Sequence, residues 1–256
     1  MEAVLLALAA AAGAGGLWWY QARGNRLGGR SYAELPAAFD DDAEVALHVA
    51  QHEAVTRGHA LSSVHILYGL VQNERVIEAL RETGADPDAF EAAILDTLDT
   101  PRPISTGVTE RVRLIYAYAF HSAGHAERKP SIVDLWAYLK DSDAVAVLET
   151  AKVSHLDILF RLVHGAVPTL DTIDLGDVHI VLRNDDYTTG DFVVELLVDT
   201  LGLAQDAAIA RTQQTHSEGR GVVGRYRAPD AKSKVQAARE LARTRGFPLW
   251  IGIEPI

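Results

Sequence analysis

The fold of the C-terminal third of the chain is decided by one polar stretch, Asn184-Asp185-Asp186-Tyr187-Thr188-Thr189-Gly190-Asp191-Phe192-Val193-Val194. An alternating apolar run, Val178–Leu182, precedes this stretch and predicts a β-strand. Thr188 and Asp191 have the spacing of a capping box and are followed by apolar residues at helical spacing, which predicts a helix over Asp191–Leu201. The stretch therefore indicates a strand, a polar turn and a helix.

The rest of this region continues the same mixed pattern. Two further strands are predicted at Val222–Arg227 and Leu249–Ile253, and two further helices at Gln205–His216 and Asp230–Arg245. The resulting order, β-α-α-β-α-β, predicts a small α+β sandwich in which the helices pack on a mostly antiparallel sheet.

Residues 31–165 are predicted to be helical throughout, because apolar residues recur there at helical spacing. A weak internal repeat supports this prediction. The run Val64–Leu70 resembles Val133–Leu139, and the two copies end in amphipathic segments at Asp88–Leu98 and His155–Val163. Two tandem copies that bury faces against each other predict a compact all-α domain.

The N-terminal segment predicts a membrane anchor. Residues 3–20 carry no charge and end in two tryptophans and a tyrosine, and Arg23, Arg26 and Arg30 follow. This length is near the lower limit of the roughly 17–25 residues that a spanning helix requires, and its flank is typical of a cytoplasmic interface. We therefore expect a single-pass protein of the inner (cytoplasmic) membrane, with its soluble domains facing the cytoplasm. A signal peptide or a disordered leader is the alternative.

The composition excludes several classes of site. The 256 residues include no cysteine and one methionine, so thiolate nucleophiles, thiolate metal ligands and disulfides are excluded. The 35 acidic and 24 basic residues give a formal net charge of −11, which argues against a nucleic-acid-binding protein. Patterning and charge together divide the chain into a membrane anchor with its basic flank (1–30), the all-α domain (31–165), a linker (166–176) and the α+β domain (177–256).

A glycine pattern and two histidine pairs resemble cofactor or metal sites but are better explained as ordinary parts of helices and turns. The glycines of Gly219–Gly224 match a dinucleotide fingerprint, but a predicted helix precedes them and a strand follows, the reverse of what that site needs. The first of these glycines is instead expected to end the helix. The pairs His48/His52 and His121/His125 can each share a helix face but lack further metal ligands. No catalytic motif is present, so we predict that the chain is not an enzyme and holds no metal or cofactor.

Three spaced motifs resemble the ClpS adaptor family. They are Asn184–Thr188, His216–Gly221 and the Pro-Leu pair that ends at Leu249. The resemblance covers residues 177–256 and includes the predicted order of strands and helices. The preceding region, from about Asp40 to Gly165, resembles the amino-terminal repeat domain of ClpA-type and ClpC-type chaperones.

The resemblance to ClpS implies a site for N-degrons, which are recognised by a free α-amino group and the first side chain. The ammonium is expected to be bound by Asn184, Asp185 and His216. Asp185 accepts from it either directly or through a water molecule. The side-chain pocket is expected to be lined by Thr188, Gly190, Val193, Thr212, Thr215 and Leu249. The family's partner-docking surface includes the equivalents of Tyr187 and Lys234. Asn and Asp also favour turns, so the alternative is that the polar stretch is only a turn and a helix cap.

Three of the pocket positions depart from the family, and one of them is Thr215, where the family usually has an apolar residue. Gly190 and Thr212 stand where methionine is common, so the amine site is kept while the apolar pocket is altered. One hypothesis is that specificity is broadened or shifted toward Ile, Val or other first residues. The other is that binding of Leu, Phe, Tyr and Trp is weakened.

The resemblance implies a membrane-tethered, non-enzymatic adaptor that recognises N-degrons and works with a ClpA- or ClpC-type ATPase in regulated proteolysis. The alternative is a regulatory interaction protein that sequesters substrates or competes for chaperone docking. In that case the all-α and α+β modules engage each other within the chain or engage a matching partner. Nucleic acid is not expected as a partner.

Overall fold

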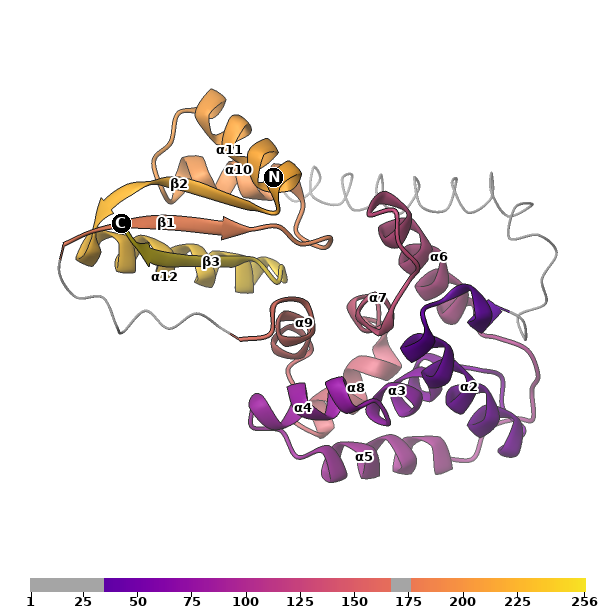
Figure 1. Cartoon of the computed structure of the whole chain (residues 1–256). Coiled ribbons are helices and arrows are strands. Elements are labelled where there is room, and N and C mark those ends of the chain that lie inside the picture. The colour runs from indigo at the N-terminus through magenta and orange to yellow at the C-terminus, as the bar shows by residue number, and fades with distance from the viewer. Residues whose placement is uncertain (1–34, 167–175) are drawn as a thin grey trace, which may run out of the picture. The chain divides into compact units, whose positions relative to one another are not determined.

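The computed structural model describes residues 35–166 and 176–256, which form two compact units (Figure 1). The first unit extends to Ser154, and the second comprises His155–Ile256. The contacts therefore group the helix at His155–His164 with the second unit, although the sequence pattern grouped it with the all-α domain.

The described part of the first unit is all-helical. Its elements are η1 (Leu35–Ala38), α2 (Asp41–Thr56), α3 (Ser63–Val71), α4 (Glu74–Glu82), α5 (Pro87–Asp99), α6 (Glu110–His125), α7 (Ile132–Ala137) and α8 (Ser142–Thr150). Helix α3 is buried along almost its whole length and contacts α2, α4, α5, α7 and α8. The predicted all-α domain therefore fits, with α3 at its centre.

The internal repeat is visible in the helix starts. Helices α2 and α6 both have 16 residues, and their capping residues, Asp40 and Thr109, are 69 positions apart. Helices α3 and α7 both begin with capping boxes, and the capping residues Ser62 and Ser131 are again 69 positions apart. The same spacing of start signals places equivalent helices in the two copies. Asp40 caps α2, because its Oδ1 accepts from the backbone N–H of Ala43 at 2.9 Å.

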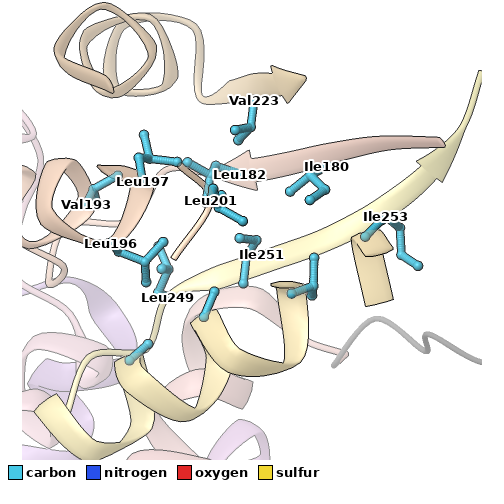
Figure 2. Packing of buried hydrophobic residues seen from close by; sticks show 14 of the residues in the cluster. Ile180, Leu182, Val193, Leu196, Leu197, Leu201, Val223, Leu249, Ile251 and Ile253 are labelled. Atoms are coloured by element: carbon cyan, nitrogen blue, oxygen red, sulfur yellow. The ribbon is translucent and has the colours of Figure 1, made fainter. Parts of the chain in front are cut away.

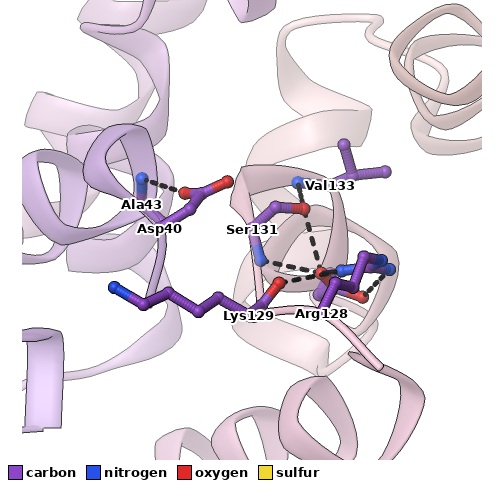
Figure 3. A network of polar contacts seen from close by, with 7 residues as sticks. Asp40, Ala43, Arg128, Lys129, Ser131 and Val133 are labelled. Carbon is purple, nitrogen blue, oxygen red and sulfur yellow. Dashed lines mark hydrogen bonds and ion pairs between the residues drawn. The ribbon is translucent and has the colours of Figure 1, made fainter. Parts of the chain in front are cut away.

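A buried polar network fixes the start of α7 (Figure 3). The fully buried carboxylate of Asp134 accepts hydrogen bonds from the backbone N–H and hydroxyl of Ser131, at 2.8 and 2.9 Å, and from Arg128 at 2.6 and 2.9 Å. The backbone N–H of Asp40 donates to the carbonyl of Pro130, which ties the start of α2 to the same segment. The charge of Asp134 is thereby neutralised and its oxygens satisfied inside the unit.

The second unit is an α+β sandwich preceded by one helix. Its elements are α9 (His155–His164), β1 (Asp177–Arg183), α10 (Gly190–Asp199), α11 (Gln205–Glu218), β2 (Arg220–Arg227), α12 (Ala228–Arg245) and β3 (Trp250–Pro255). The strands form an antiparallel sheet in the order β2-β1-β3. From β1 onward the observed order is the predicted β-α-α-β-α-β.

The core of this unit lies between the sheet and its helices (Figure 2). Ile180 and Leu182 of β1 and Ile251 of β3 are at most 1% exposed and pack with apolar residues of α10 and α12. Leu196 and Leu197 of α10 are fully buried in the same cluster. Helix α11 contacts β2, and α12 contacts all three strands. The turn between β1 and α10 is therefore held between two well-packed elements.

The start of α10 differs from the prediction. The capping residue is Thr189, whose hydroxyl accepts from the N–H of Phe192 at 3.4 Å. Thr188 does not cap the helix, because its hydroxyl donates to Asp185 instead. The predicted end of α11 is confirmed, since Gly219 adopts a left-handed conformation with φ of 73°.

The fold class with an N-terminal membrane helix, and the single-pass membrane localisation drawn from it, are corrected. Within residues 35–166 and 176–256, no helix is both long and apolar enough to span a bilayer. The longest helix there, α12, has 18 residues but includes both acidic and basic side chains. The predicted anchor at residues 3–20 lies outside the described residues.

Candidate functional site

The polar turn after β1 is organised by one carboxylate. Oδ1 of Asp185 accepts from the backbone N–H groups of Tyr187, at 2.8 Å, and Thr188, at 2.6 Å. Oδ2 accepts from the Thr188 hydroxyl at 2.9 Å. These three bonds occupy three of the roughly four acceptor positions that a carboxylate offers. Asp185 therefore shapes the turn and has about one acceptor position left, on Oδ2.

Asn184 and His216 are brought together from positions 32 residues apart. The N–H of Asn184 donates to the carbonyl of Gly219 at 2.9 Å, which anchors the turn beside the end of α11. His216, in the last turn of α11, places Nδ1 3.4 Å from Oδ1 of Asn184. His216 is exposed and Asn184 is half-buried. In this contact Nδ1–H of His216 donates to the amide oxygen, which keeps a second lone pair, and the other ring nitrogen is left as an acceptor. Both groups suit an ammonium donor.

Gly190 and Thr212 face each other between α10 and α11. A Cβ built on Gly190 would lie 3.7 Å from Cγ2 of Thr212, which is ordinary van der Waals contact. The Thr212 hydroxyl donates to the carbonyl of Ala208, so the methyl group is the part turned toward Gly190. The two positions where the family commonly has methionine are therefore neighbours, and both carry little side-chain volume.

The remaining pocket residues are packed more deeply. The Thr215 hydroxyl donates to the carbonyl of Arg211. A Cβ built on Gly221 would lie only 2.1 Å from the Thr215 hydroxyl oxygen. The glycine at 221 therefore allows β2 to approach α11 closely. Val193 and Leu249 are 7% and 5% exposed and belong to the core cluster, close to its edge with the turn (Figure 2).

Comparison with known proteins finds two family matches. Residues 176–252 match the family model of the ATP-dependent Clp protease adaptor protein ClpS, and residues 38–114 match that of the Clp repeat N-terminal domain. The ClpS of Neisseria meningitidis is 42% identical over 77 residues, which cover 30% of this chain and 75% of the relative. The chain belongs to the ClpS adaptor family. The ClpS of Acetivibrio thermocellus is 41% identical over 76 residues, 30% of this chain and 77% of the relative.

Solved structures give similar matches. The ClpS2 of Agrobacterium tumefaciens bound to L-phenylalaninamide is 29% identical, covers 32% of this chain and 100% of its own, and has a TM-score of 0.31. The Hsp104 N-terminal domain of Candida albicans is 14% identical, covers 48% of this chain and 88% of its own, and has a TM-score of 0.45.

The family membership gives the chain its general role. A ClpS module and a Clp repeat in one chain make it a Clp-associated adaptor, with Clp ATPases and their substrates as the general partners. ClpS proteins are adaptors and not catalysts, in agreement with the expectation that the chain is not an enzyme.

The two expected docking residues of the ClpS module, Tyr187 and Lys234, differ in their bonding. Tyr187 is half-buried and its backbone N–H belongs to the Asp185 turn. Lys234 of α12 donates from Nζ to the carbonyls of Thr200 and Leu201, at 3.3 and 3.5 Å, at the end of α10. The ammonium of Lys234 also lies 6.0 Å from the centre of the Tyr226 ring. The lysine therefore stabilises the C-terminal end of a helix within the module.

The histidine pairs do not form metal sites in the described part of the chain. No group of three or more His, Cys, Asp or Glu side chains there is arranged to hold a metal ion. His48 lies 3.7 Å from Glu44, and the rings of His121 and His125 lie 4.5 Å apart in an edge-to-face arrangement. Such pairs are ordinary neighbours on one helix face.

One residue of the site was not predicted from the sequence. His164, at the end of α9, donates from Nε2 to the carbonyl of Pro248 at 2.7 Å. The same nitrogen lies 3.8 Å from Oδ2 of Asp185. The side chains of His164 and Asp185 are 4% and 0% exposed. No pattern in the sequence indicates a contact of this histidine with residues 185 and 248.

Proposed function

We propose that the ClpS module binds the free α-amino group and first side chain of N-degron substrates for delivery to a ClpA- or ClpC-type ATPase. The observation that carries this proposal is the pairing of Asn184 Oδ1 with His216 Nδ1 at 3.4 Å, next to the Asp185 turn. Nδ1–H of His216 orients the Asn184 oxygen, whose second lone pair and the other ring nitrogen of His216 remain as acceptors. Such acceptors suit the three N–H donors of an ammonium group, and an acetylated terminus offers only one N–H.

The side-chain pocket of this proposal lies beside Gly190, Val193, Thr212 and Leu249, with Thr188 and Thr215 at its turn and helix walls. Methionine side chains at 190 and 212 would fill space that glycine and threonine leave open, because the two positions are in contact range. We therefore propose that this pocket accepts first residues that a methionine-lined pocket excludes, with Ile and Val as the test cases.

The amine site is tested by measuring the affinity of the full chain for fluorescent peptides that differ only in the first residue. Asn184→Ala and His216→Ala each remove one partner of the ammonium, so each is expected to weaken binding about tenfold. Gln213→Ala, an exposed change on the same helix as His216, is the matched control and leaves binding unchanged. If Asn184→Ala and His216→Ala bind the peptides as tightly as Gln213→Ala and the wild-type chain do, the amine site is refuted.

The pocket is tested with the Gly190→Met and Thr212→Met variants. Each is expected to reduce the affinity for peptides that begin with Ile or Val more than for those that begin with Leu or Phe. A methylene group in an apolar pocket changes specificity by roughly 10-fold or more, so the expected change in the Ile-to-Leu ratio is about that size. An unchanged ratio would mean that positions 190 and 212 do not line the pocket.

The partner-docking role of Tyr187 and Lys234 is part of the same proposal. Because Lys234 is half-buried and bonded to the end of α10, Lys234→Ala is expected to weaken both that helix end and the binding of the ATPase's N-terminal domain. Ser233→Ala, at the exposed neighbouring position, is the control. A pull-down with the ATPase domain and a thermal melt separate the two effects. Full ATPase binding by Lys234→Ala would exclude the docking role.

A further inference from the structure

Helix α9 contacts the ClpS module at two points. Its first turn carries Asp157, which accepts two hydrogen bonds from the guanidinium of Arg243, at 2.7 and 3.0 Å. Its last residue is His164, which reaches Pro248 and Asp185. Every residue from 155 to 164 is buried or half-buried. The helix is therefore held to the module at its first turn and at its last residue.

The contact at the end of α9 falls on the expected amine site. His164 Nε2 lies 3.8 Å from Asp185 Oδ2, the oxygen that still has an acceptor position after the turn bonds are counted. The Asp185 side chain has no exposed surface in this arrangement. Pro248, which accepts from the same nitrogen, directly precedes the pocket residue Leu249. The imidazole thus covers the remaining acceptor of Asp185 and is bonded to the backbone next to the pocket.

The two contacts of α9 differ in kind. The Asp157–Arg243 pair is partly solvated, with side chains 34% and 57% exposed, so it contributes little to binding strength but fixes the orientation of the helix. The His164 contact is buried and directional. A helix held in this way can be displaced without unfolding the sheet, because the core cluster of the module contains no residue of α9.

We propose that α9 is an inhibitory latch on the amine site. While His164 covers Asp185, this carboxylate cannot accept from a substrate ammonium, and only Asn184 and His216 remain accessible. Departure of α9 frees Asp185 and completes the site. The proposal rests on the proposed function, because it needs the site to bind an amine.

The latch predicts that substrate affinity rises when α9 is released. The apparent affinity of a site equals its intrinsic affinity multiplied by the fraction of molecules in the competent state. We expect His164→Ala to bind a free-amine peptide about fivefold more tightly than the wild-type chain, and Arg243→Ala about twofold. Arg245→Ala removes the similar exposed pair Glu195–Arg245 on the same module and is the matched control, with no change.

A cross-link tests the same proposal in the opposite direction. The natural sequence has no cysteine, so Asp157→Cys/Arg243→Cys can be joined specifically by a bis-methanethiosulfonate reagent that reductant cleaves. The cross-linked full chain is expected to bind the free-amine peptide at least fivefold more weakly than the same chain after reduction. The pair Glu195→Cys/Arg245→Cys, joined by the same reagent, is the control and shows no difference.

The outcomes separate the latch from the proposed function. Equal peptide binding by the cross-linked, reduced and His164→Ala chains would overturn the latch and leave the amine site standing. Weaker binding by His164→Ala would also overturn it, since His164 would then be a positive part of the site. Absence of free-amine binding in every form would overturn the proposed function and the latch with it. Amide hydrogen exchange at Tyr187 and Thr188 measures, independently of peptide binding, whether α9 covers the turn. If it does, exchange at these two residues is expected to be faster in His164→Ala than in the wild-type chain.

Discussion

Two buried aspartates, one in each unit, are held alike but neutralised differently. The side chains of Asp134 and Asp185 are both 0% exposed, and each accepts from a backbone N–H and a hydroxyl in a turn that precedes or begins a helix. Asp134 also binds Arg128 through two hydrogen bonds. In the described part of the chain, no lysine or arginine forms an ion pair with Asp185, and His164 lies 3.8 Å away.

The difference separates a structural carboxylate from one that can serve a ligand. A buried charge without a partner is costly, so a carboxylate that is complete within its unit, like Asp134, contributes to stability. Asp185 accepts the hydrogen bonds of its turn but forms no ion pair with an arginine of the described chain, so it can bind a cationic group of a ligand. We infer that the same local chemistry is used for folding in one unit and for recognition in the other.

The largest expected effect is on stability at Asp134. Asp134→Ala removes the buried carboxylate that accepts from Arg128, the Ser131 hydroxyl and the Ser131 N–H, so the free energy of unfolding of the first unit is expected to fall by about 3 kcal/mol. Chemical denaturation of the full chain followed by circular dichroism measures this. Asp143→Ala, exposed in the first turn of α8, is the control and changes it by about 0.5 kcal/mol at most. A loss below 1 kcal/mol at Asp134 would show that the network is not structural.

The second prediction uses the other copy of this capping box. His65 occupies the position equivalent to Asp134 and accepts from the Ser62 N–H at 3.1 Å through Nδ1. Burial lowers the pKa of His65 from 6.5 to about 4. The unfolded chain therefore takes up a proton at a higher pH than the folded chain, and stability is lost as pH falls from 6.5 to about 4.

We expect this loss to be about 3 kcal/mol. His65→Gln keeps a capping-box acceptor but does not titrate, so the first unit of this variant is expected to have a flatter stability profile between neutral and mildly acid pH. Denaturation curves at several pH values measure the difference between the variant and the wild-type chain. Identical slopes would show that His65 is not protonated preferentially on unfolding.

Loss of the charge of Asp185 is expected to affect ligand binding more than stability. Asp185→Asn keeps an oxygen that can accept from the turn but removes the charge, so the free energy of unfolding is expected to change by less than about 1 kcal/mol. Affinity for a free-amine peptide is expected to fall about tenfold, because the ammonium loses a charged acceptor. Fluorescence anisotropy and denaturation on the same preparation separate the two effects. A loss of stability without a loss of affinity would assign Asp185 to the turn alone.

The smallest expected effect concerns the helix cap next to Asp185. Thr189→Ala removes the hydroxyl that accepts from Phe192 N–H, and a lost N-cap costs about 1 kcal/mol. Thr189→Ser retains the hydroxyl and is the matched control. Thermal melting of both variants measures the difference. If Thr189→Ala and Thr189→Ser melt together, the cap does not contribute measurably.

Much of the fold was predictable because its signals are local. The order β-α-α-β-α-β follows from alternating and helical apolar patterns, and Asp40 and Gly219 mark a helix start and a helix end by their own backbone chemistry. The pairing of Asn184 with His216 was expected from motifs that a family resemblance supplied. Spacing along the chain alone does not predict it, since 32 residues separate the two.

The features that the sequence did not reveal depend on tertiary contacts. Both Thr188 and Thr189 can cap a helix, and the choice is made by the Asp185 carboxylate, which takes the Thr188 hydroxyl. The role of His164 depends on contacts with residues 185 and 248, which no periodicity connects to it. The membrane prediction rested on the length of an uncharged segment and on its aromatic and basic flank, and this segment lies outside the described residues.

The most direct test of the account compares two peptides that differ only in acetylation of the amino terminus. Titration of the full chain by isothermal calorimetry is expected to show binding of the free-amine peptide and at least tenfold weaker binding of the acetylated one. In Asp185→Asn this difference is expected to shrink, while Asp134 variants that remain folded keep it. Equal affinity of the wild-type chain for both peptides would contradict the assignment of Asn184, Asp185 and His216 to an amine site.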